Sequence, residues 1–507
     1  MFPITRVTWT AALLALVAAQ SASAQASPYI SFDDTRLPLL EHLIGRGDIA
    51  DPSPMVRPFR WADAERVLAA ADTAPGTASG RLIHELRQSF TADTAKARWQ
   101  VELRAGGQAF TQRRRDPLHL GGDGGVKPYG DFMLAGEFGP VVAVSRAAIE
   151  PRLFGDPDWP NGPRPGRESE QFVGRLIEGY LSGQFKYGAL TYGQLLRNWG
   201  PVGVPGIPLS PVAYERQGLA IEVGTSKIKL SALGATLRPE LNSLNQAVNR
   251  YYFVHRLDLQ VSERLRIAPW ETIIIQGVGR TFETPFANPL SLSVLANSFG
   301  ISDTGSNVMV GLDASWRAGR RTTLQLQGAV DDFWFNDRQQ KQDRWALTFA
   351  GYGALGERLG WRGWYTQVSS LALRTANPFE NFTDQGVGIG RNWSDMDQTG
   401  FAVTVPVRQR WLLSPEVVFQ RQGEGRINAP YPEPVNGVQT QPMLFIGTIE
   451  YTYRLGLGIS GREGPLDLLA TAGVHHVTND QNQPGVTANR FVAQIQATLA
   501  WRRRGRL

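Results

Sequence analysis

The sequence predicts a transmembrane β-barrel of about 18 antiparallel strands, preceded by a small α-helical segment. Charged residues make up only 19% of the 507 residues, against about 25% in soluble proteins. The chain also holds 54 Gly and 14 Trp. Beyond the N-terminus no run approaches the roughly 20 apolar residues that a spanning helix needs. Short alternating runs of apolar and polar residues follow one another instead, as in lipid-facing strands.

Residues 1–24 are predicted to be a secretory signal peptide. Arg6 supplies a basic start, residues 9–19 are largely apolar but too short to span a bilayer, and Ala22 and Ala24 are small residues at the −3 and −1 positions. Cleavage is expected before Gln25. An N-terminal membrane anchor is the less favoured alternative because the apolar run is short. We therefore expect an exported chain that resides in the bacterial outer membrane.

Residues 25–97 are predicted to form a helical segment that caps or plugs the barrel from the periplasmic side. Asp33 or Asp34 is expected to cap a first helix, in which Leu37, Leu40 and Leu43 share one face. Residues 62–71 and 81–90 show the same helical spacing of apolar residues. Three short helices bury little surface alone, so we expect them to pack on the larger body.

Residues 98–507 are assigned to the barrel. The last run is the clearest, because Phe491, Ile495 and Leu499 alternate with Gln494 and Gln496. Residues 251–261, including Phe253, show the same period and are also expected to face lipid. The predicted strands are 100–110, 130–138, 140–150, 171–181, 183–193, 218–224, 226–236, 251–261, 266–279, 307–317, 322–330, 343–354, 361–373, 400–406, 408–420, 441–455, 465–475 and 491–501.

The longer intervening segments are predicted to be extracellular loops or folds into the lumen, since periplasmic turns are short. A soluble propeller is the main alternative fold, but no repeat of 40–50 residues is visible. The basic residues that follow Trp501 are expected to extend into the periplasm or to lack structure. The predicted loops are 113–128, 152–168, 195–211, 239–249, 281–306, 377–399, 423–440 and 478–489.

The composition argues against several kinds of chemistry. Cys is absent, so no thiolate nucleophile or Cys-based metal site is available. The six His show no metal-binding spacing, and neither a Gly-x-Ser-x-Gly nor a phosphate-binding loop motif occurs. Asp331 and Asp332 are adjacent in a strand and point to opposite faces, so Asp332 is expected to make lumen or rim contacts, with Ca²⁺ binding as a weaker alternative. We expect no enzyme activity, no metal and no cofactor.

Two Arg-Asn-Trp triplets are the candidate functional residues. Arg197-Asn198-Trp199 opens a Pro- and Gly-rich stretch between strands, and Arg391-Asn392-Trp393 lies in a predicted loop. A Trp face can lie against a sugar ring, while Arg and Asn donate hydrogen bonds to hydroxyl or carboxylate groups. The alternative is that each Trp plugs the lumen with Arg stacked on it. For Trp199 the plug is favoured.

The triplet Arg197-Asn198-Trp199 with Gly200-Pro201 resembles the Trp-Gly-Pro segment of the Wzi-type capsule assembly proteins. Further motifs follow in the order found in that family, and the helical start also resembles it. The resemblance implies an outer-membrane barrel of about eighteen strands with a periplasmic helical bundle and a lectin-like role in holding capsular polysaccharide. The motifs are His255-Arg256-Leu257-Asp258, Glu271, Asn288-Pro289-Leu290, Gly311-Leu312-Asp313 and Asp331-Asp332-Phe333.

The predicted function is therefore polysaccharide binding by a monomeric outer-membrane barrel. Its expected partners are a surface or capsular polysaccharide and outer-membrane lipid or lipopolysaccharide, in keeping with a net charge of +6; nothing resembles a nucleic-acid-binding stripe. The runner-up is a porin or transport channel for small solutes. A hydrolase that uses an unrecognised carboxylate pair is a third, weaker hypothesis.

Overall fold

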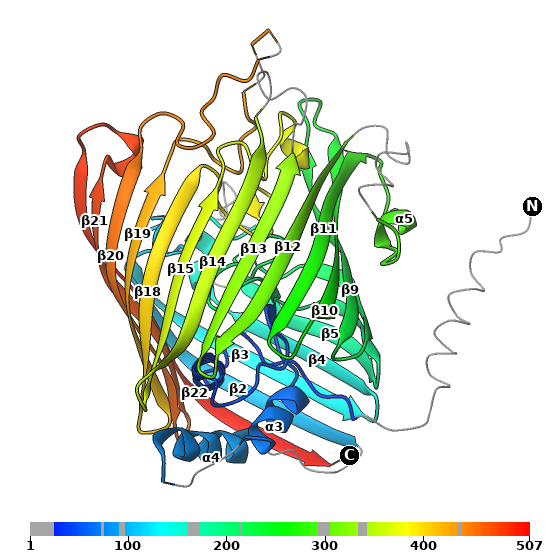
Figure 1. The fold of residues 1–507 in the computed structure, drawn as a ribbon, viewed down its shortest axis with the longest axis vertical. Helices are drawn as coiled ribbons and strands as arrows, with labels where there is room; N and C mark the ends of the chain where they lie inside the picture. Colours follow the sequence, from blue (N-terminus) through cyan, green and yellow to red (C-terminus); the bar gives the residue numbers. More distant parts are fainter. Residues whose placement is uncertain are drawn as a thin grey trace, which may run out of the picture.

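The chain folds into a closed, tilted β-barrel with helices at one end (Figure 1). The structure is a computed structural model that describes residues 25–71, 76–90, 97–160, 173–212, 214–292, 305–332, 342–432, 435–436 and 438–506. The predicted signal peptide lies outside these residues. No helix in the described part of the chain is long and apolar enough to cross a membrane.

Eighteen antiparallel strands close the barrel, and the last pairs with the first, Leu103 lying opposite Trp501. They are β2 (Ala97–Phe110), β3 (Gly125–Phe138), β4 (Val141–Ile149), β5 (Gly174–Phe185), β6 (Gly188–Gln194), β8 (Gln217–Gly224), β9 (Ile228–Leu241), β10 (Ala247–Gln260), β11 (Leu265–Val278), β12 (Ser306–Gly319), β13 (Thr322–Asp332), β14 (Arg344–Leu355), β15 (Leu359–Val368), β18 (Met396–Val407), β19 (Trp411–Gln422), β20 (Glu450–Glu463), β21 (Leu466–Thr478) and β22 (Thr487–Arg506).

Each predicted strand overlaps one of these eighteen, so the predicted fold class is confirmed. The alternation also assigns the faces correctly in β22, where Phe491 is 62% and Leu499 is 61% exposed, whereas Val492 is 4% exposed. Boundaries were less accurate: the strand predicted at 441–455 is Glu450–Glu463. This error arises because the preceding loop also contains apolar residues.

One outward-facing surface is covered rather than exposed. Phe253 was expected to face lipid, but it is fully buried together with Ile273 and Ile275 beneath Phe286 of α5 (Thr284–Ala287). The segment that carries α5 lies against the outside of the barrel beside β9–β11 (Figure 1). The expectation of lipid exposure at Phe253 was wrong because alternation identifies the outer face and not what covers it.

The turns of two to four residues all lie at one end of the barrel, and the longer connections lie at the other. The predicted loop 239–249 was wrong: β9 and β10 fill most of it, and only residues 242–246 connect them. Conversely, the connection before β18 begins at residue 369 and not at 377. Long loops are typical of the extracellular end of such barrels, so the short-turn end corresponds to the periplasm.

The basic C-terminal residues belong to the barrel. β22 continues through Arg506, which lies opposite Arg98 in β2. Arg502 forms ion pairs with Glu102 (3.1 Å) and with Asp467. The expectation that this tail leaves the strand was wrong, because neighbouring strands supply carboxylates that neutralise its inward-facing arginine.

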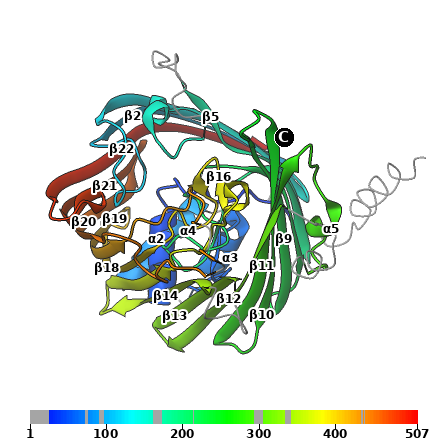
Figure 2. The same ribbon diagram turned by 90° about the horizontal axis from the view of Figure 1, so that it is seen from above.

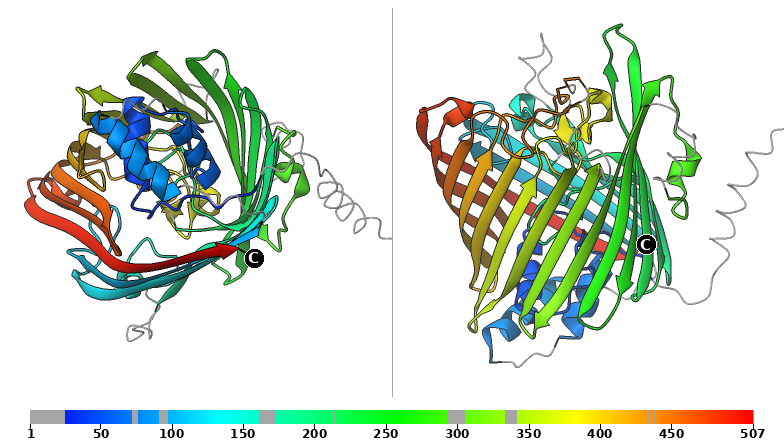
Figure 3. Two further views of the ribbon diagram at one scale, coloured as in Figure 1. Left: turned by 90° about the horizontal axis from the view of Figure 1, so that it is seen from below. Right: turned by 45° about the horizontal axis from the view of Figure 1, so that its top comes forward.

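The N-terminal segment enters the short-turn end of the lumen, as the view from below shows (Figure 3). It contains α2 (Leu37–Arg46), α3 (Trp61–Ala69) and α4 (Ala78–Phe90), whose apolar faces share a core with Leu412 of the barrel wall. The three predicted helices are confirmed. The predicted Asp cap was wrong: the N-cap of α2 is Arg36, and the Asp34 carboxylate accepts a hydrogen bond from the backbone N–H of Arg36.

Arginines fasten this segment to the barrel. Arg46 donates to the carbonyl oxygens of Glu357 (2.8 Å) and Leu359 (2.5 Å) in the turn between β14 and β15. Asp33 accepts from Arg104 of β2 (2.8 Å) and from Arg146 of β4 (2.7 Å). Charge-assisted hydrogen bonds of this kind are stronger than neutral ones, so the segment is held from two sides of the lumen.

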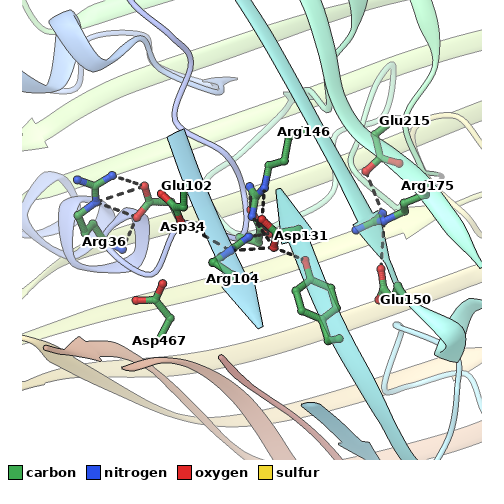
Figure 4. Close-up of polar contacts among 12 residues, drawn as sticks. Asp34, Arg36, Glu102, Arg104, Asp131, Arg146, Glu150, Arg175, Glu215 and Asp467 are labelled. Carbon is green, nitrogen blue, oxygen red and sulfur yellow. Dashed lines mark hydrogen bonds and ion pairs between the residues drawn. The ribbon is translucent and has the colours of Figure 1, made fainter. Parts of the chain in front are cut away.

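Figure 4 shows the charged wall formed by β2–β5. Arg104 and Arg146 both point at Asp131 of β3, with nitrogen–oxygen distances of 2.8 and 3.1 Å. Further along the wall, Arg175 lies 3.1 Å from Glu150 and 2.9 Å from Glu215. These inward-facing charges are paired with one another and face the lumen, while the apolar face of the same strands points outward.

His42 of α2 predicts a dependence of stability on pH. Its Nδ1 lies 2.7 Å from the Thr404 hydroxyl, and burial followed by the charge of Arg46 lowers its pKa to about 4. In the unfolded chain His42 takes up a proton near pH 6.5, whereas in the folded chain it stays neutral down to about pH 4. The neutral, buried His42 therefore contributes to the free energy of unfolding above pH 6.5, and this contribution is lost as the pH falls through 4. We expect the free energy of unfolding to fall by about 3 kcal/mol between pH 7.5 and pH 4. The shift in the urea midpoint between these two pH values measures this loss.

The control for this prediction is His42→Gln, which keeps a hydrogen-bonding group opposite Thr404 but does not titrate in this range. Its pH dependence between 7.5 and 4 is expected to be smaller than that of the natural chain by the His42 contribution. Equal slopes for the two proteins would rule out His42 as the source.

Candidate functional site

The first Arg-Asn-Trp triplet lies inside the barrel, in an infold formed by residues 195–211. Asn198 and Trp199 form the two-residue strand β7 (Asn198–Trp199), which pairs with β1 (Val56–Arg57) of the N-terminal segment. The Trp199 N–H donates to the carbonyl of Leu209 (2.9 Å), and the Gly200 N–H donates to that of Met55 (2.9 Å). The stretch was expected not to form a strand, but a partner from the helical segment makes this short pairing possible.

Gly203 and Gly206 of the infold each occupy a position where a side chain would not fit, for different reasons. Gly203 has a φ of +69°, a left-handed conformation that residues with a Cβ rarely adopt. Gly206 is required by close approach, because an added Cβ would lie 2.0 Å from the carbonyl oxygen of Trp199. Together they let the chain fold back tightly on Trp199.

Arg197 and Asn198 are used within the infold itself. The Asn198 side chain donates to the carbonyl of Val204 (3.1 Å) and accepts from the Gly206 N–H (2.8 Å). Arg197 donates to the carbonyl of Leu195 (3.2 Å), and its burial lowers its pKa. The hydrogen bonds of Arg197 and Asn198 therefore stabilise the fold of the infold itself.

Gln327 of β13, in the barrel wall, is hydrogen-bonded to the infold. Its side-chain N–H₂ donates to the carbonyl of Trp199 (2.9 Å) and to Asp313 (2.9 Å), while its carbonyl accepts from the Ile207 N–H (2.8 Å). Asp313 also accepts from the Trp270 indole (2.8 Å) and from Arg256. Two further motifs quoted for the family resemblance, those that contain Arg256 and Asp313, therefore meet next to Trp199. Gln327 was missed, since a strand Gln carries no distinguishing sequence signal.

Apolar side chains fill the lumen around Trp199, which is 4% exposed. The core combines the infold, the wall strands and residues 369–395, which descend from the long-loop end (Figure 2). The Ser210 hydroxyl donates to the carbonyl of Gly390 (2.6 Å), joining the two inserted segments. Trp199 is therefore buried inside the barrel, within the core that these segments share.

Arg391 belongs to this interior and not to the outer mouth. It is 1% exposed, and its Nη2 donates to the Thr348 hydroxyl (2.5 Å). Its Nε and Nη1 have no hydrogen-bond partner among the described residues. Burial lowers its pKa to about 9, because the charged guanidinium loses hydration without gaining a carboxylate partner.

Asn392 and Trp393 instead line a cavity of about 320 Å³ at the long-loop end. The cavity is formed where four connections meet, those after β2, β4, β15 and β19. The Asn392 side chain also accepts from the Gly388 N–H (2.8 Å), which orients the turn that presents Trp393. The other polar or charged lining residues are Arg114, His119, Asp158, Gln385, Ser394, Gln422, Arg426 and Asn428.

Aromatic and charged side chains lie side by side in this cavity. The His119 ring packs over Trp393, with centroids 4.9 Å apart and planes tilted by 32°. His119 Nδ1 lies 2.6 Å from Asp116; burial acts to raise the pKa of Asp116, but contact with His119 outweighs it and lowers that pKa. Arg114 makes two hydrogen bonds to Asp158, of 2.9 and 2.8 Å. The lining is thus largely preorganised.

Two buried polar groups at this cavity are unsatisfied. The Trp393 indole N–H and the Ser394 hydroxyl find no hydrogen-bond partner within the described part of the chain. The next residue, Asp395, holds the facing loop in place by accepting from the N–H groups of Gly425 and Ile446, both at 2.9 Å. Buried polar groups are normally hydrogen-bonded, so these two mark a place for a hydroxyl-bearing molecule or water.

For Asp332, the remaining predicted site residue, the structure describes the backbone alone. Asp332 ends β13, where it lies opposite Arg344, and its side chain lies outside the described residues. No group of three or more His, Cys, Asp or Glu side chains suited to a metal occurs among the residues that the structure describes. Sequence reasoning missed Arg114, His119 and Asp158, which come from loops with no recognisable motif.

No protein-family model matches the sequence, and no curated protein matches it significantly. Among solved structures the chain is similar to Wzi, described as an outer-membrane protein involved in group 1 capsule assembly in Escherichia coli and as a carbohydrate-binding β-barrel. That match has a TM-score of 0.60 at 13% identity and covers 94% of this chain and 99% of Wzi.

The chain is also similar to two Pseudomonas aeruginosa proteins. The outer-membrane protein OprD matches with a TM-score of 0.44 and 9% identity over 81% of this chain and 94% of its own. OccK11 (OpdR) matches with a TM-score of 0.43 and 9% identity over 81% and 96%. At 13% identity the likeness to Wzi concerns the fold alone. The chain has the fold of an outer-membrane β-barrel that is preceded in the sequence by a few short helices.

Proposed function

We propose that this protein is a member of the Wzi-type capsule assembly family that binds a surface polysaccharide outside the cell, at the cavity beside Trp393. The observation that carries the proposal is the pair of unsatisfied polar groups, the Trp393 N–H and the Ser394 hydroxyl, in a cavity that also presents His119, Arg114 and Asn428. Sugar hydroxyls are both donors and acceptors, and so complement this lining. The location is the bacterial outer membrane, as an exported, non-enzymatic barrel.

The size of the cavity supports one or a few sugar residues of a longer polymer. About 320 Å³ lies near the lower end of the range for ligand pockets. A polymer would contact many copies of the protein on one cell, so weak individual contacts would add up to firm retention. The exposed side chains Arg426 and Asn428 at the rim leave room for the polymer to continue in both directions.

The filled lumen supports binding over transport. Trp199, Leu209 and Ile389 share one apolar core with side chains of the barrel wall, and α2 enters from the other end (Figure 3). Single-channel recording in planar bilayers tests this point. We expect no sizeable ohmic conductance, whereas stable open channels would favour the porin alternative.

Trp393→Ala tests the proposed site. Truncation removes the aromatic surface and the unsatisfied donor, and we expect at least a tenfold loss of affinity for surface polysaccharide purified from the producing strain, measured by biolayer interferometry. In cells that carry the variant, polysaccharide should shift from the cell surface to the medium.

The matched control is Trp316→Ala, which removes a half-exposed Trp from the outer face of β12. It should leave polysaccharide affinity unchanged. Equal affinities of the natural chain and Trp393→Ala would contradict the proposal, provided that both proteins give the same heat-dependent gel shift as folded barrels.

A further inference from the structure

A second cavity lies inside the barrel, remote from the cavity beside Trp393. Its volume is about 430 Å³, and it separates the infold from α2. The N-terminal segment contributes Phe32 and Leu37, the infold contributes Val204, and the wall contributes Ala402 and Leu412. These apolar side chains form a lumenal cavity whose preferred occupant is an apolar molecule.

One cation in this lumenal cavity has no ion-paired carboxylate among the described residues. The guanidinium of Arg362 reaches from β15 across to the infold, where it lies against Gly203, and it packs 5.1 Å from the centre of the Trp364 ring. Among the described residues its Nε has no hydrogen-bond partner, and the carboxylates of Glu416 and Glu41 act on its charge without an ion pair to it. A charge held among apolar side chains favours the arrival of an anion.

Other ionisable groups of the lumenal cavity already have partners within the protein. Glu41 forms an ion pair with Arg57 (2.5 Å), and His42 is hydrogen-bonded to Thr404 (2.7 Å). The guanidinium of Arg362 is therefore the group in this lining that can receive a negatively charged ligand. A ligand that fits must combine one anionic group with an apolar body.

A further cavity lies beside the lumenal cavity, at the short-turn end of the barrel. This rim cavity, of about 460 Å³, shares Gly45 and Tyr352 with the lumenal cavity. An added Cβ at Gly45 would lie 3.8 Å from the Tyr352 ring, so a larger side chain at this position would fill the space where the two cavities adjoin. The arginines that line the rim cavity are Arg66, Arg264, Arg266, Arg317 and Arg320. The same lining also holds Asp48, Asp51 and Glu263, so five arginines against three carboxylates leave a formal excess of two positive charges, which attracts anions.

We propose that the lumenal cavity is a binding site for a fatty acid. The alkyl chain lies among Phe32, Val204 and Leu412, and the carboxylate pairs with Arg362. The rim cavity provides the route from the periplasmic side, past Gly45. This site is separate from the proposed polysaccharide site, so either proposal can fail alone.

Decanoate binding tests the proposal. The full-length protein, held in amphipol to avoid detergent, is titrated calorimetrically with decanoate and with 1-decanol. We expect decanoate to bind at least tenfold more tightly than decanol. Arg362→Gln should abolish this preference, and Arg362→Lys should restore most of it. Equal affinities for decanoate and decanol in the natural chain would overturn the proposal.

Two further variants keep the test decisive if Arg362→Gln does not fold. Gly45→Leu fills the junction and should weaken the binding of both decanoate and decanol, with the barrel wall intact. Arg408→Gln removes the same charge from an exposed turn and should leave both affinities unchanged. Unaltered decanoate binding in Gly45→Leu, or a loss of decanoate affinity in Arg408→Gln equal to that in Arg362→Gln or Gly45→Leu, would overturn the site.

Discussion

Trp199→Ala is expected to lower the free energy of unfolding of the infold by about 3–5 kcal/mol, the usual cost of truncating a large buried aromatic side chain. Trp199 is 4% exposed and packs with Leu209, Tyr252 and Ile389. Backbone contacts hold both sides of the residue, so the surroundings cannot collapse readily into the space left behind. Hydrogen exchange of the backbone amides of Trp199 and Ile207 measures the loss directly.

Trp199→Phe is the graded comparison, since it keeps an aromatic ring and should cost clearly less than alanine. Trp316→Ala on the outer face controls for the general effect of removing an indole. Exchange rates at these two amides that are unchanged in Trp199→Ala would show that the infold does not depend on this side chain for its stability.

Asp313→Ala is expected to destabilise the barrel by about 3–5 kcal/mol, because it leaves buried partners without their acceptor. Asp313 is 1% exposed and accepts hydrogen bonds from Arg256, from the Trp270 indole (2.8 Å) and from Gln327 (2.9 Å). Arg256 keeps its hydrogen bonds to Asp258, whereas Trp270 loses its acceptor. Urea unfolding in phospholipid vesicles, followed by tryptophan fluorescence, gives the change.

Asp313→Asn preserves the volume and one acceptor oxygen, so its cost should be well below that of alanine. The double variant Asp313→Ala with Trp199→Ala tests whether Gln327 links the two sites. Residues that share a hydrogen-bonded partner are usually non-additive, and we expect the combined cost to be smaller than the sum. Strict additivity would mean that the wall holds the infold independently of Asp313.

Strand number, strand order and outward faces could be predicted from the sequence because they depend on local periodicity. Phe491, Leu499 and their alternating neighbours lie on one apolar face of a strand, and in a membrane barrel the apolar face is the one that turns outward. Even there the prediction was incomplete at Phe253, which α5 covers. Coverage depends on a loop from another part of the chain, and alternation carries no information about it.

The candidate site could be predicted only in part. Trp393 and Asn392 were chosen as residue types suited to sugars, and they do line one cavity. Arg391, in the same triplet, points into the lumen instead, because successive residues of an irregular loop take unrelated directions. His119 and Arg114 reach the cavity from a loop more than 250 residues away in sequence, and no local pattern marks them.

The sequence alone determined that this chain is a closed barrel with a helical start, because hydrophobic periodicity and the demands of the bilayer are local and strong. Only the tertiary structure decided what fills the barrel. Trp199 is held inside the barrel because β1 pairs with β7 and Gln327 hydrogen-bonds to the infold, while Arg362 lines a cavity. These outcomes depend on contacts between segments far apart in the chain, whose meeting is set by strand register and loop packing and not by the properties of either segment.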